Sequence, residues 1–344
     1  MAKVELRLKK EATLDEWKEI YDLAVKFREL RCWEWIRDTD IFGVQHPKTG
    51  ENAYCCVLGN GGDIFGLNAY IGERGLESYM DTLYDTVPQD DILYIQDCIA
   101  LSFEDREMLD KKDLNKIREL GLKFRGRNQW PKFRSFKPGY CPWYIDADEL
   151  EKMKHVIEQV IDVVTRCKED KSLLMTDDDS KILVRVPTRK KNDLVWKDKY
   201  MKVEFNEKDY SEYGQIDELA LKRIKHSKAK KMGVWELDFF HVPALVKEGE
   251  RPYYPLVFLA ADGETGIMLD LLMTSNFEGY MKEFQDAFVQ LLAKIKALPE
   301  AIVIQRKDVL MAIEPVTRKL GVKIEPVEEL IVIEEFRKSL EMFL

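Results

Sequence analysis

The chain has 344 residues, a length that suits two average domains. Hydrophobic residues make up 45% of it and charged residues 34%, with a formal net charge of -9, so each half can bury a core. This acidic balance disfavours non-specific binding to nucleic acid, which needs a dominant positive field. Any contact with a polyanion would have to come from a local basic patch.

The cysteines and the apolar runs indicate the compartment in which the protein is expected. Six cysteines occur without a Cys-x-x-Cys pair, and the four histidines lie far from them in the sequence. These spacings predict no metal site, and they favour reduced, partly buried thiols in a cytoplasmic protein. Residues 1–10 lack the apolar core of a signal peptide, and no apolar run reaches the about 18 residues of a membrane span. We therefore expect a soluble protein without a membrane partner or a cofactor.

The first half alternates helical and extended patterns. Apolar residues at helical spacing predict a helix over residues 14–30, with Thr13 as its N-cap and Glu16 completing a capping box. Turn sequences at 47–51 and 59–62 would join short strands into hairpins. The remaining expected elements are strands at 41–44, 53–58, 65–71 and 92–100, and helices at 75–83, 113–120 and 146–167. The pattern predicts an α+β N-terminal domain with a small antiparallel sheet over residues 1–170.

A charged stretch at residues 168–180 is typical of a solvated connector, so we expect the second domain to span residues 181–344. Its expected strands are 182–186, 201–205, 234–241, 256–260, 267–273, 301–304 and 322–324, and its expected helices are 216–231, 277–296, 309–320 and 334–342.

From about residue 234 the expected order is β-β-β-α-β-α-β-α. This order resembles the ribonuclease H-like fold of retroviral-type integrases and transposases. Three segments carry the resemblance: Trp235-Glu236-Leu237-Asp238 as the first strand, Asp262-Gly263-Glu264-Thr265-Gly266 as the hairpin turn, and residues 298–304 leading into the fourth strand. The resemblance implies an α/β C-terminal domain with a mixed sheet.

Members of that family hold two metal ions with three carboxylates. The resemblance places the first carboxylate at Asp238, which is the candidate catalytic residue. Gln305 stands at the end of the fourth strand, where the family has its second Asp; it is followed by two cations and then by Asp308. The glutamates near the C-terminus form no distinguishing motif. The alternative is that Asp238 is an outward-facing or hydrogen-bonded strand residue without catalytic function.

The stretch 122–144 interleaves cations with aromatic residues. It carries six cations and no acid between residues 123 and 137. Arginine and aromatic planes together can clamp phosphates and stack bases. The candidate ligand-binding residues are Arg125, Arg127, Trp130, Arg134, Tyr140 and Trp143. The alternative is a long ordered loop whose aromatic side chains plug the sheet, with Arg over Trp or Tyr rings.

The same stretch, in the order Phe-Arg-Gly, Trp-Pro, Phe-Arg, Pro-Gly-Tyr, Pro-Trp, resembles a family of uncharacterised bacterial two-domain proteins. The resemblance spans most of the chain and brings no assigned activity. The leading hypothesis is a non-catalytic binding or accessory protein that recognises a nucleotide, a nucleic acid or another anionic ligand. The alternative is a metal-dependent phosphodiesterase or nuclease that uses Asp238 with Asp262 or Asp308 and one C-terminal Glu.

Overall fold

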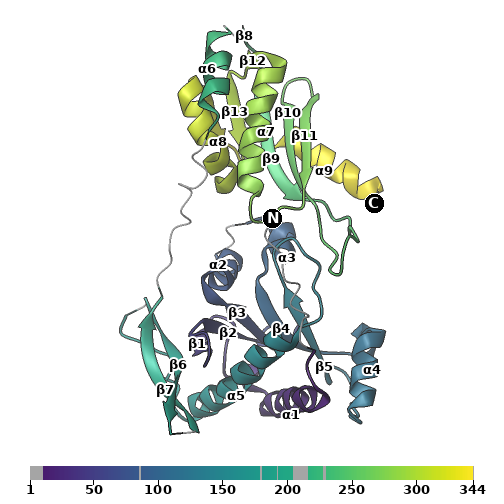
Figure 1. The fold of residues 1–344 in the computed structure, drawn as a ribbon, viewed down its shortest axis with the longest axis vertical. Helices are drawn as coiled ribbons and strands as arrows, with labels where there is room; N and C mark the ends of the chain where they lie inside the picture. The colour runs from purple at the N-terminus through teal and green to yellow at the C-terminus, as the bar shows by residue number, and fades with distance from the viewer. Residues whose placement is uncertain are drawn as a thin grey trace, which may run out of the picture. The chain divides into compact units, whose positions relative to one another are not determined.

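The computed structural model describes residues 11–84, 87–178, 180–191, 193–203, 216–227 and 230–343. They form two compact units. The first unit comprises residues up to 86, 95–137 and 142–205, and the second comprises 87–94, 138–141 and 206–344. Each unit combines helices with a β-sheet, so the architecture is α+β in both (Figure 1).

The first unit is built on a seven-stranded sheet with the order β5-β4-β3-β2-β1-β6-β7. Neighbouring strands are antiparallel, except that β1 and β6 are parallel. The strands are β1 (Phe42–Gln45), β2 (Asn52–Leu58), β3 (Gly66–Ile71), β4 (Cys98–Glu104), β5 (Trp130–Phe136), β6 (Lys181–Lys190) and β7 (Asp193–Lys202). The sheet is thus larger than the small sheet expected from the sequence.

Helices cover both faces of this sheet. Helices α1 (Leu14–Leu30) and α5 (Ala147–Glu169) lie side by side on one face, and α2 (Gly72–Leu83) packs on the other (Figure 1). Helix α1 has the expected bounds, and its capping box between Thr13 and Glu16 is confirmed. Helix α4 (Lys111–Glu119) begins with a second capping box, made by Asp110 and Asp113.

Three segments differ from the expectations. The strand expected at 92–100 is the short helix α3 (Ile92–Ile95) followed by β4, and the part up to Tyr94 belongs to the second unit. The aromatic–basic stretch is an edge strand, β5, where it pairs with β4, instead of an irregular loop. The β6–β7 hairpin follows the expected connector at 168–180, yet it belongs to the first unit because β6 pairs with β1.

The second unit contains a five-stranded sheet with the order β11-β10-β9-β13-β14. Strands β9, β10 and β11 are antiparallel, whereas β13 is parallel to both β9 and β14. The strands are β9 (Val234–His241), β10 (Leu256–Asp262), β11 (Met268–Thr274), β13 (Ala301–Ile304) and β14 (Lys323–Pro326). A separate pair joins β8 (Lys230–Lys231) to β12 (Ala297–Leu298).

Side chains alternate across this sheet along β9. Leu237 and Phe239 join the core formed with α6 (Glu218–His226), α7 (Tyr280–Ile295) and α8 (Lys307–Leu320). Phe240 joins the core on the opposite face, formed with α9 (Ile331–Phe343). Asp238 alternates with Leu237 and Phe239, so it lies on the α9 face. Residues 1–10, 204–205 and 228–229, on which parts of the sequence expectations fall, lie outside the described residues.

Among the described helices, none combines the length and apolar character that crossing a membrane requires. All six cysteines are free thiols, as expected; five are buried and Cys141 is partly exposed.

Candidate functional site

The second unit contains a buried cluster of charges around Arg306, which lies between β13 and α8. The Arg306 Nη1 atom donates to Asp91 Oδ2 at 2.6 Å, and its Nη2 atom donates to Asp308 Oδ2 at 2.8 Å. Nη1 also donates to the carbonyl of Phe239 at 3.2 Å, and the guanidinium lies 4.9 Å from the centroid of the Phe239 ring. Burial opposes the charged form of Arg306, but Asp308, Asp238 and Asp91 together raise its pKa above the ordinary value.

Helix α9 brings a second guanidinium to this cluster. Arg337 Nη2 lies 3.6 Å from Asp91 Oδ1, and its Nη1 lies 3.3 Å from Glu334 Oε1. Glu236 on β9 fixes the start of α9, because its Oε2 atom accepts hydrogen bonds from the backbone N–H groups of Val332 and Ile333, each at 3.0 Å. A carboxylate at a helix N-terminus also interacts favourably with the helix dipole.

Asp238 lies beside these groups and is 1% exposed. Its Oδ1 atom is buried and has no hydrogen-bond partner within the described part of the chain. Burial raises the pKa of Asp238 from 3.8 to about 7, although Arg306 and Arg337 act in the opposite direction. The sequence thus placed this carboxylate correctly on a strand, and its charged neighbours are Arg306, Arg337 and Asp308.

The two carboxylates that the sequence offers as metal ligands beside Asp238 are Asp262 and Asp308, and neither is available to share a metal ion with it. Asp262 pairs opposite Trp235 on the β9–β10 ladder, three residues from Asp238, which corresponds to about 10 Å along a strand. Its Oδ1 atom accepts hydrogen bonds from Thr265 and therefore shapes the β10–β11 turn. Asp308 is in the cluster, but both of its oxygens accept hydrogen bonds from Arg306. The described residues contain no group of three or more His, Cys, Asp or Glu side chains that could hold a metal ion.

The aromatic–basic stretch of the first unit divides into parts with different surroundings. Arg134 on β5 is turned toward the N-terminus of α4, where Nη2 donates to Asp113 Oδ2 at 2.6 Å and to Asp110 Oδ2 at 2.9 Å. Its guanidinium also lies 4.8 Å from the centroid of the Tyr144 ring. Burial opposes the charged form, but the bonds to Asp113 raise the pKa of Arg134 above the ordinary value. Two carboxylates therefore already neutralise this cation.

The three aromatic candidates each have different neighbours. Trp130 contacts Phe124 at a ring-centroid distance of 5.8 Å and is covered by Arg106, 5.9 Å from its ring. Trp143 exchanges two backbone hydrogen bonds with Ser135, at 2.7 and 2.9 Å. The third candidate, Tyr140, belongs to the second unit and packs against Phe277 there, at 5.1 Å. These contacts agree with the alternative interpretation of this stretch, in which the aromatic side chains pack within the protein and cations lie over their rings.

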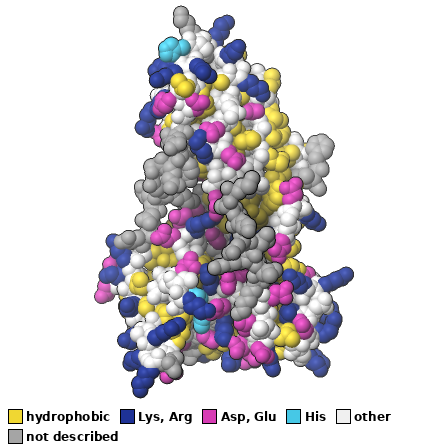
Figure 2. All heavy atoms as spheres, viewed as in Figure 1, with side chains coloured by type: hydrophobic (Ala, Val, Ile, Leu, Met, Phe, Trp, Pro, Cys, Tyr) yellow, Lys and Arg dark blue, Asp and Glu magenta, His cyan; other side chains and the backbone are white. Residues whose placement is uncertain are grey.

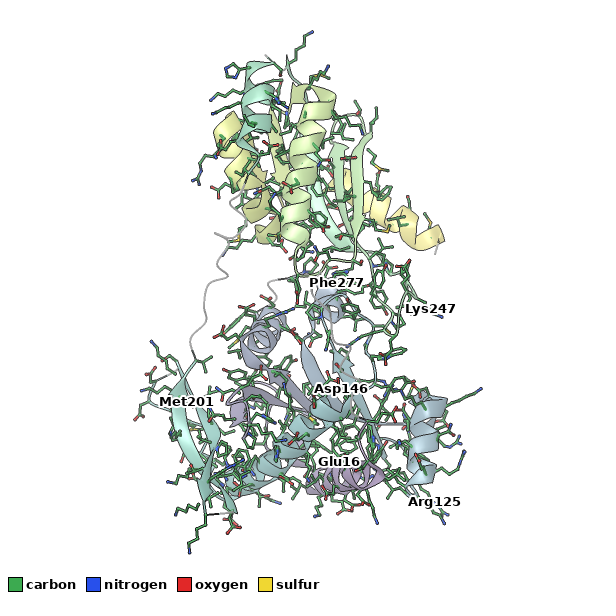
Figure 3. All side chains as sticks on the ribbon, in the orientation of Figure 1. Glu16, Arg125, Asp146, Met201, Lys247 and Phe277 are labelled. Carbon is green, nitrogen blue, oxygen red and sulfur yellow. The ribbon has the colours of Figure 1, made fainter. Side chains whose placement is uncertain are left out.

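Arg125 and Arg127 remain at the surface of the first unit, and Figure 3 shows Arg125 extending from it. The side chain of Arg127 is 90% exposed, with Nε 3.4 Å from Asp105 Oδ2. Two open hollows adjoin this segment, one of about 450 Å³ and one of about 350 Å³, and Arg28 of α1 lines both. Lys26 and Lys123 line the larger hollow.

The smaller hollow combines cations with aromatic rings. It is lined by Arg31 and Arg127 together with Trp33 and Phe65. Arg28 is held between the two hollows, because its Nη1 atom donates to the carbonyl of Gln129 at 2.7 Å. Each hollow has three cations and one acid in its lining. Two cations of the smaller hollow also lie near carboxylates outside its lining, Arg31 at 2.6 Å from Glu34 and Arg127 at 3.4 Å from Asp105. Figure 2 shows acidic and basic side chains interspersed over the drawn face of this unit.

The contribution of α1 to this surface was not apparent in the sequence. Arg28 and Gln129 are 101 residues apart, so only the fold brings them together. The available signal was the group of cations at residues 26, 28 and 31 near the C-terminal end of the expected helix. Cations there are favoured by the helix dipole, so this group has a sufficient structural explanation from the sequence alone.

Comparisons with known proteins agree with the division into two domains. One family model, described as a domain of unknown function (DUF7309), matches residues 17–185. A second, described as a domain of unknown function (DUF6930), matches residues 220–341. A search of curated proteins finds no match to the chain. The chain is therefore a two-domain protein that is similar, over these two stretches, to two domains of unknown function.

Proposed function

We propose that this protein binds a phosphate-bearing ligand, a nucleotide or a short single strand of nucleic acid, on the surface of its first unit. The surface consists of the end of α1 and residues 122–129, and we call it the α1 basic surface. The observation that carries the proposal is that Arg28 lines two adjacent hollows, each with an excess of cations. Spaced cations beside the partly exposed rings of Phe65 and Phe124 suit a phosphate chain whose bases stack on aromatic side chains.

The second unit has an accessory or binding role in this proposal instead of a hydrolytic one. Three antiparallel strands followed by two parallel strands support a ribonuclease H-like fold for it. The position of the metal-binding carboxylates in such a fold is taken here by an ion cluster centred on Arg306. A guanidinium already hydrogen-bonded to Asp91 and Asp308 competes directly with a divalent cation for the same oxygens.

Fluorescence anisotropy with a labelled single-stranded oligonucleotide and with a labelled nucleotide tests the proposal. The double variant Lys123→Ala/Arg127→Ala removes one exposed cation from each hollow and should weaken binding by about a hundredfold or more, since each charge-assisted contact contributes about 1.5–3 kcal/mol. The slope of affinity against salt concentration should also decrease.

The matched control is Arg118→Ala/Lys171→Ala, which removes two exposed cations that line neither hollow. It should bind as the wild type does. Equal binding by the wild type and by Lys123→Ala/Arg127→Ala, or an absence of binding to both probes, would overturn the proposal.

A further inference from the structure

A third hollow of the first unit lies at the ends of β2, β4 and β5, beside the first turns of α2 and α5. Figure 3 marks the start of α5 by Asp146. The hollow has a volume of about 670 Å³, within the range of about 300–1,000 Å³ that is typical of small-molecule sites. None of the cations of the α1 basic surface lines it. We call it the α2–α5 cleft.

The cleft carries both signs of charge in nearly equal number. Four carboxylates and three cations line it, and each of the cations lies near one of the carboxylates. Lys152 Nζ is 2.9 Å from Glu51 Oε2, Lys137 Nζ is 3.8 Å from Glu149 Oε1, and Arg74 Nε is 3.8 Å from Asp97 Oδ2. A ligand with one sign of charge would meet repulsion as well as attraction here, whereas a ligand with both signs can meet a complement for each.

A small cavity with a hydrogen-bond donor and an acceptor adjoins the inner wall of the cleft. Asn52 lines both the cleft and a small adjoining cavity, which His46 also lines. The Asn52 Oδ1 and His46 Nε2 atoms are buried and have no hydrogen-bond partner among the residues that the structure describes. The volume of the small cavity is about 10 Å³, about the minimum for one water molecule.

The protonation of His46 follows from its surroundings. The backbone N–H of Thr49 donates to His46 Nδ1 at 3.2 Å, so Nδ1 is an acceptor. Burial, and then the neighbouring His155, lower the pKa of His46 and favour the neutral ring. A neutral imidazole whose Nδ1 accepts a hydrogen bond carries its proton on Nε2. His46 Nε2 is therefore a donor and Asn52 Oδ1 an acceptor, and the two together can hold one water molecule in the small cavity, beside a ligand group such as a peptide amide in the cleft.

Apolar surface completes the lining. Tyr54 of β2, Ile99 of β4 and Phe136 of β5 line the cleft, and β3 lies between β2 and β4 in the sheet. Such surface can receive an apolar side chain of a ligand whose charged ends contact the rim.

We infer that the α2–α5 cleft binds a zwitterionic small molecule that contains an amide and an apolar group, of the chemical class of a dipeptide. The ligand carboxylate contacts Arg74 or Lys137, its ammonium contacts the carboxylates of the rim, and its amide lies at Asn52, from which a water molecule in the small cavity leads to His46. This site is separate from the α1 basic surface, so failure of one proposal leaves the other in place.

Isothermal titration calorimetry with glycyl-L-phenylalanine tests this inference. Two blocked forms are the informative comparisons: the N-acetyl form lacks the ammonium, and the C-terminal amide lacks the carboxylate. We expect the free dipeptide to bind and each blocked form to bind about tenfold more weakly or worse, because each loses a charge-assisted hydrogen bond.

Variants then locate the site. Arg74→Ala/Lys137→Ala removes two side chains that are 61% and 53% exposed, so folding should be retained and can be checked by thermal unfolding. This variant should bind the free dipeptide about tenfold more weakly than the wild type. Arg118→Ala/Lys171→Ala, which changes the charge equally away from the cleft, should bind normally.

The inference is overturned if the free dipeptide does not bind to the wild type. It is also overturned if the blocked forms bind as well as the free one, or if Arg74→Ala/Lys137→Ala binds with unchanged affinity.

Discussion

Asp91 and Arg306 are 215 residues apart in the sequence, yet Arg306 Nη1 donates to Asp91 Oδ2 at 2.6 Å in the interior of the second unit. Their side chains are 4% and 12% exposed, respectively. Two buried charges are tolerated when they are paired and their remaining hydrogen-bonding capacity is satisfied. Here Arg337 completes the shell of Asp91, and Asp308 completes that of Arg306.

Replacing Arg306 should destabilise the protein strongly. Arg306→Met keeps much of the side-chain length but leaves Asp91 and Asp308 without their principal counter-ion. Removing one partner of a buried pair costs about 3–5 kcal/mol. Urea unfolding measures this loss, and Arg318→Ala is the control, because Arg318 forms an exposed ion pair with Glu314 worth less than about 1 kcal/mol. A loss below about 1 kcal/mol for Arg306→Met would contradict the role assigned to this cluster.

The stability of the wild type should depend on pH through Asp238. Its pKa is raised from 3.8 to about 7 in the folded state, so the folded protein retains a proton that the unfolded chain releases. The stabilisation is complete below pH 4 or so and is lost as the pH rises to about 7, at up to about 1.4 kcal/mol per pH unit.

Asp238→Asn removes this titration. The free energy of unfolding of the wild type minus that of Asp238→Asn should therefore fall between about pH 4 and pH 7 and level off above that range. Denaturant titrations at several pH values give this difference. The exposed Asp22→Asn on α1 serves as a control and should follow the wild type throughout. A difference that stays constant with pH would show that Asp238 is already ionised in the folded protein at pH 4.

Truncation of Arg134 should lower the free energy of unfolding far more than truncation of Arg125, although both belong to the same aromatic–basic stretch. Arg134→Ala leaves Asp113, whose side chain is 9% exposed, without its ion-pair partner, and should cost about 3 kcal/mol. Arg125→Ala changes an exposed side chain and should stay within about 0.5 kcal/mol of the wild type. Guanidinium unfolding midpoints compare the two. Similar losses for both variants would mean that the pair with Asp113 contributes little.

Divalent cations should not stabilise the wild type. Arg306 already donates to both oxygens of Asp308, and Arg337 lies beside Asp91, so little negative charge remains for Mg²⁺ or Mn²⁺. Thermal unfolding with and without each ion measures this. A ligand at about 100 times its dissociation constant would add about 2.7 kcal/mol. A rise in the melting temperature that disappears in Asp238→Asn would instead favour the phosphodiesterase alternative.

Apolar periodicity predicted the helices and strands whose formation depends on residues close to one another in the sequence. The bounds of α1 follow from its apolar spacing and from the capping box at Thr13, both of which are local. The succession of elements from β9 to α9 was likewise predicted, because each strand or helix has its own apolar pattern and a turn sequence beside it. Asp238 was placed on its strand for the same reason.

Strand pairing and ion pairing between residues far apart in the sequence could not be predicted from such local patterns. The stretch that forms β5 contains two cations and a proline, and only its pairing with β4 makes it a strand. Nothing local to Arg134 indicates Asp113 as its partner, and nothing near Gln305 indicates that Arg306 is turned toward Asp91. The ligand-binding interpretation therefore assigned to an anionic ligand a cation, Arg134, that the fold pairs with Asp110 and Asp113.

The participation of residues 87–94 in the second unit has a consequence for how this protein can be divided. A fragment cut at residue 220, where the second family match begins, would lack Asp91 and also Tyr94, whose ring lies 4.8 Å from that of His241. Such a fragment would keep the five-stranded sheet but lose the contacts of Asp91 with Arg306 and of Tyr94 with His241. During synthesis, the same segment leaves the ribosome more than 200 residues before Arg306, so the ion cluster can close only after almost the whole chain has been made.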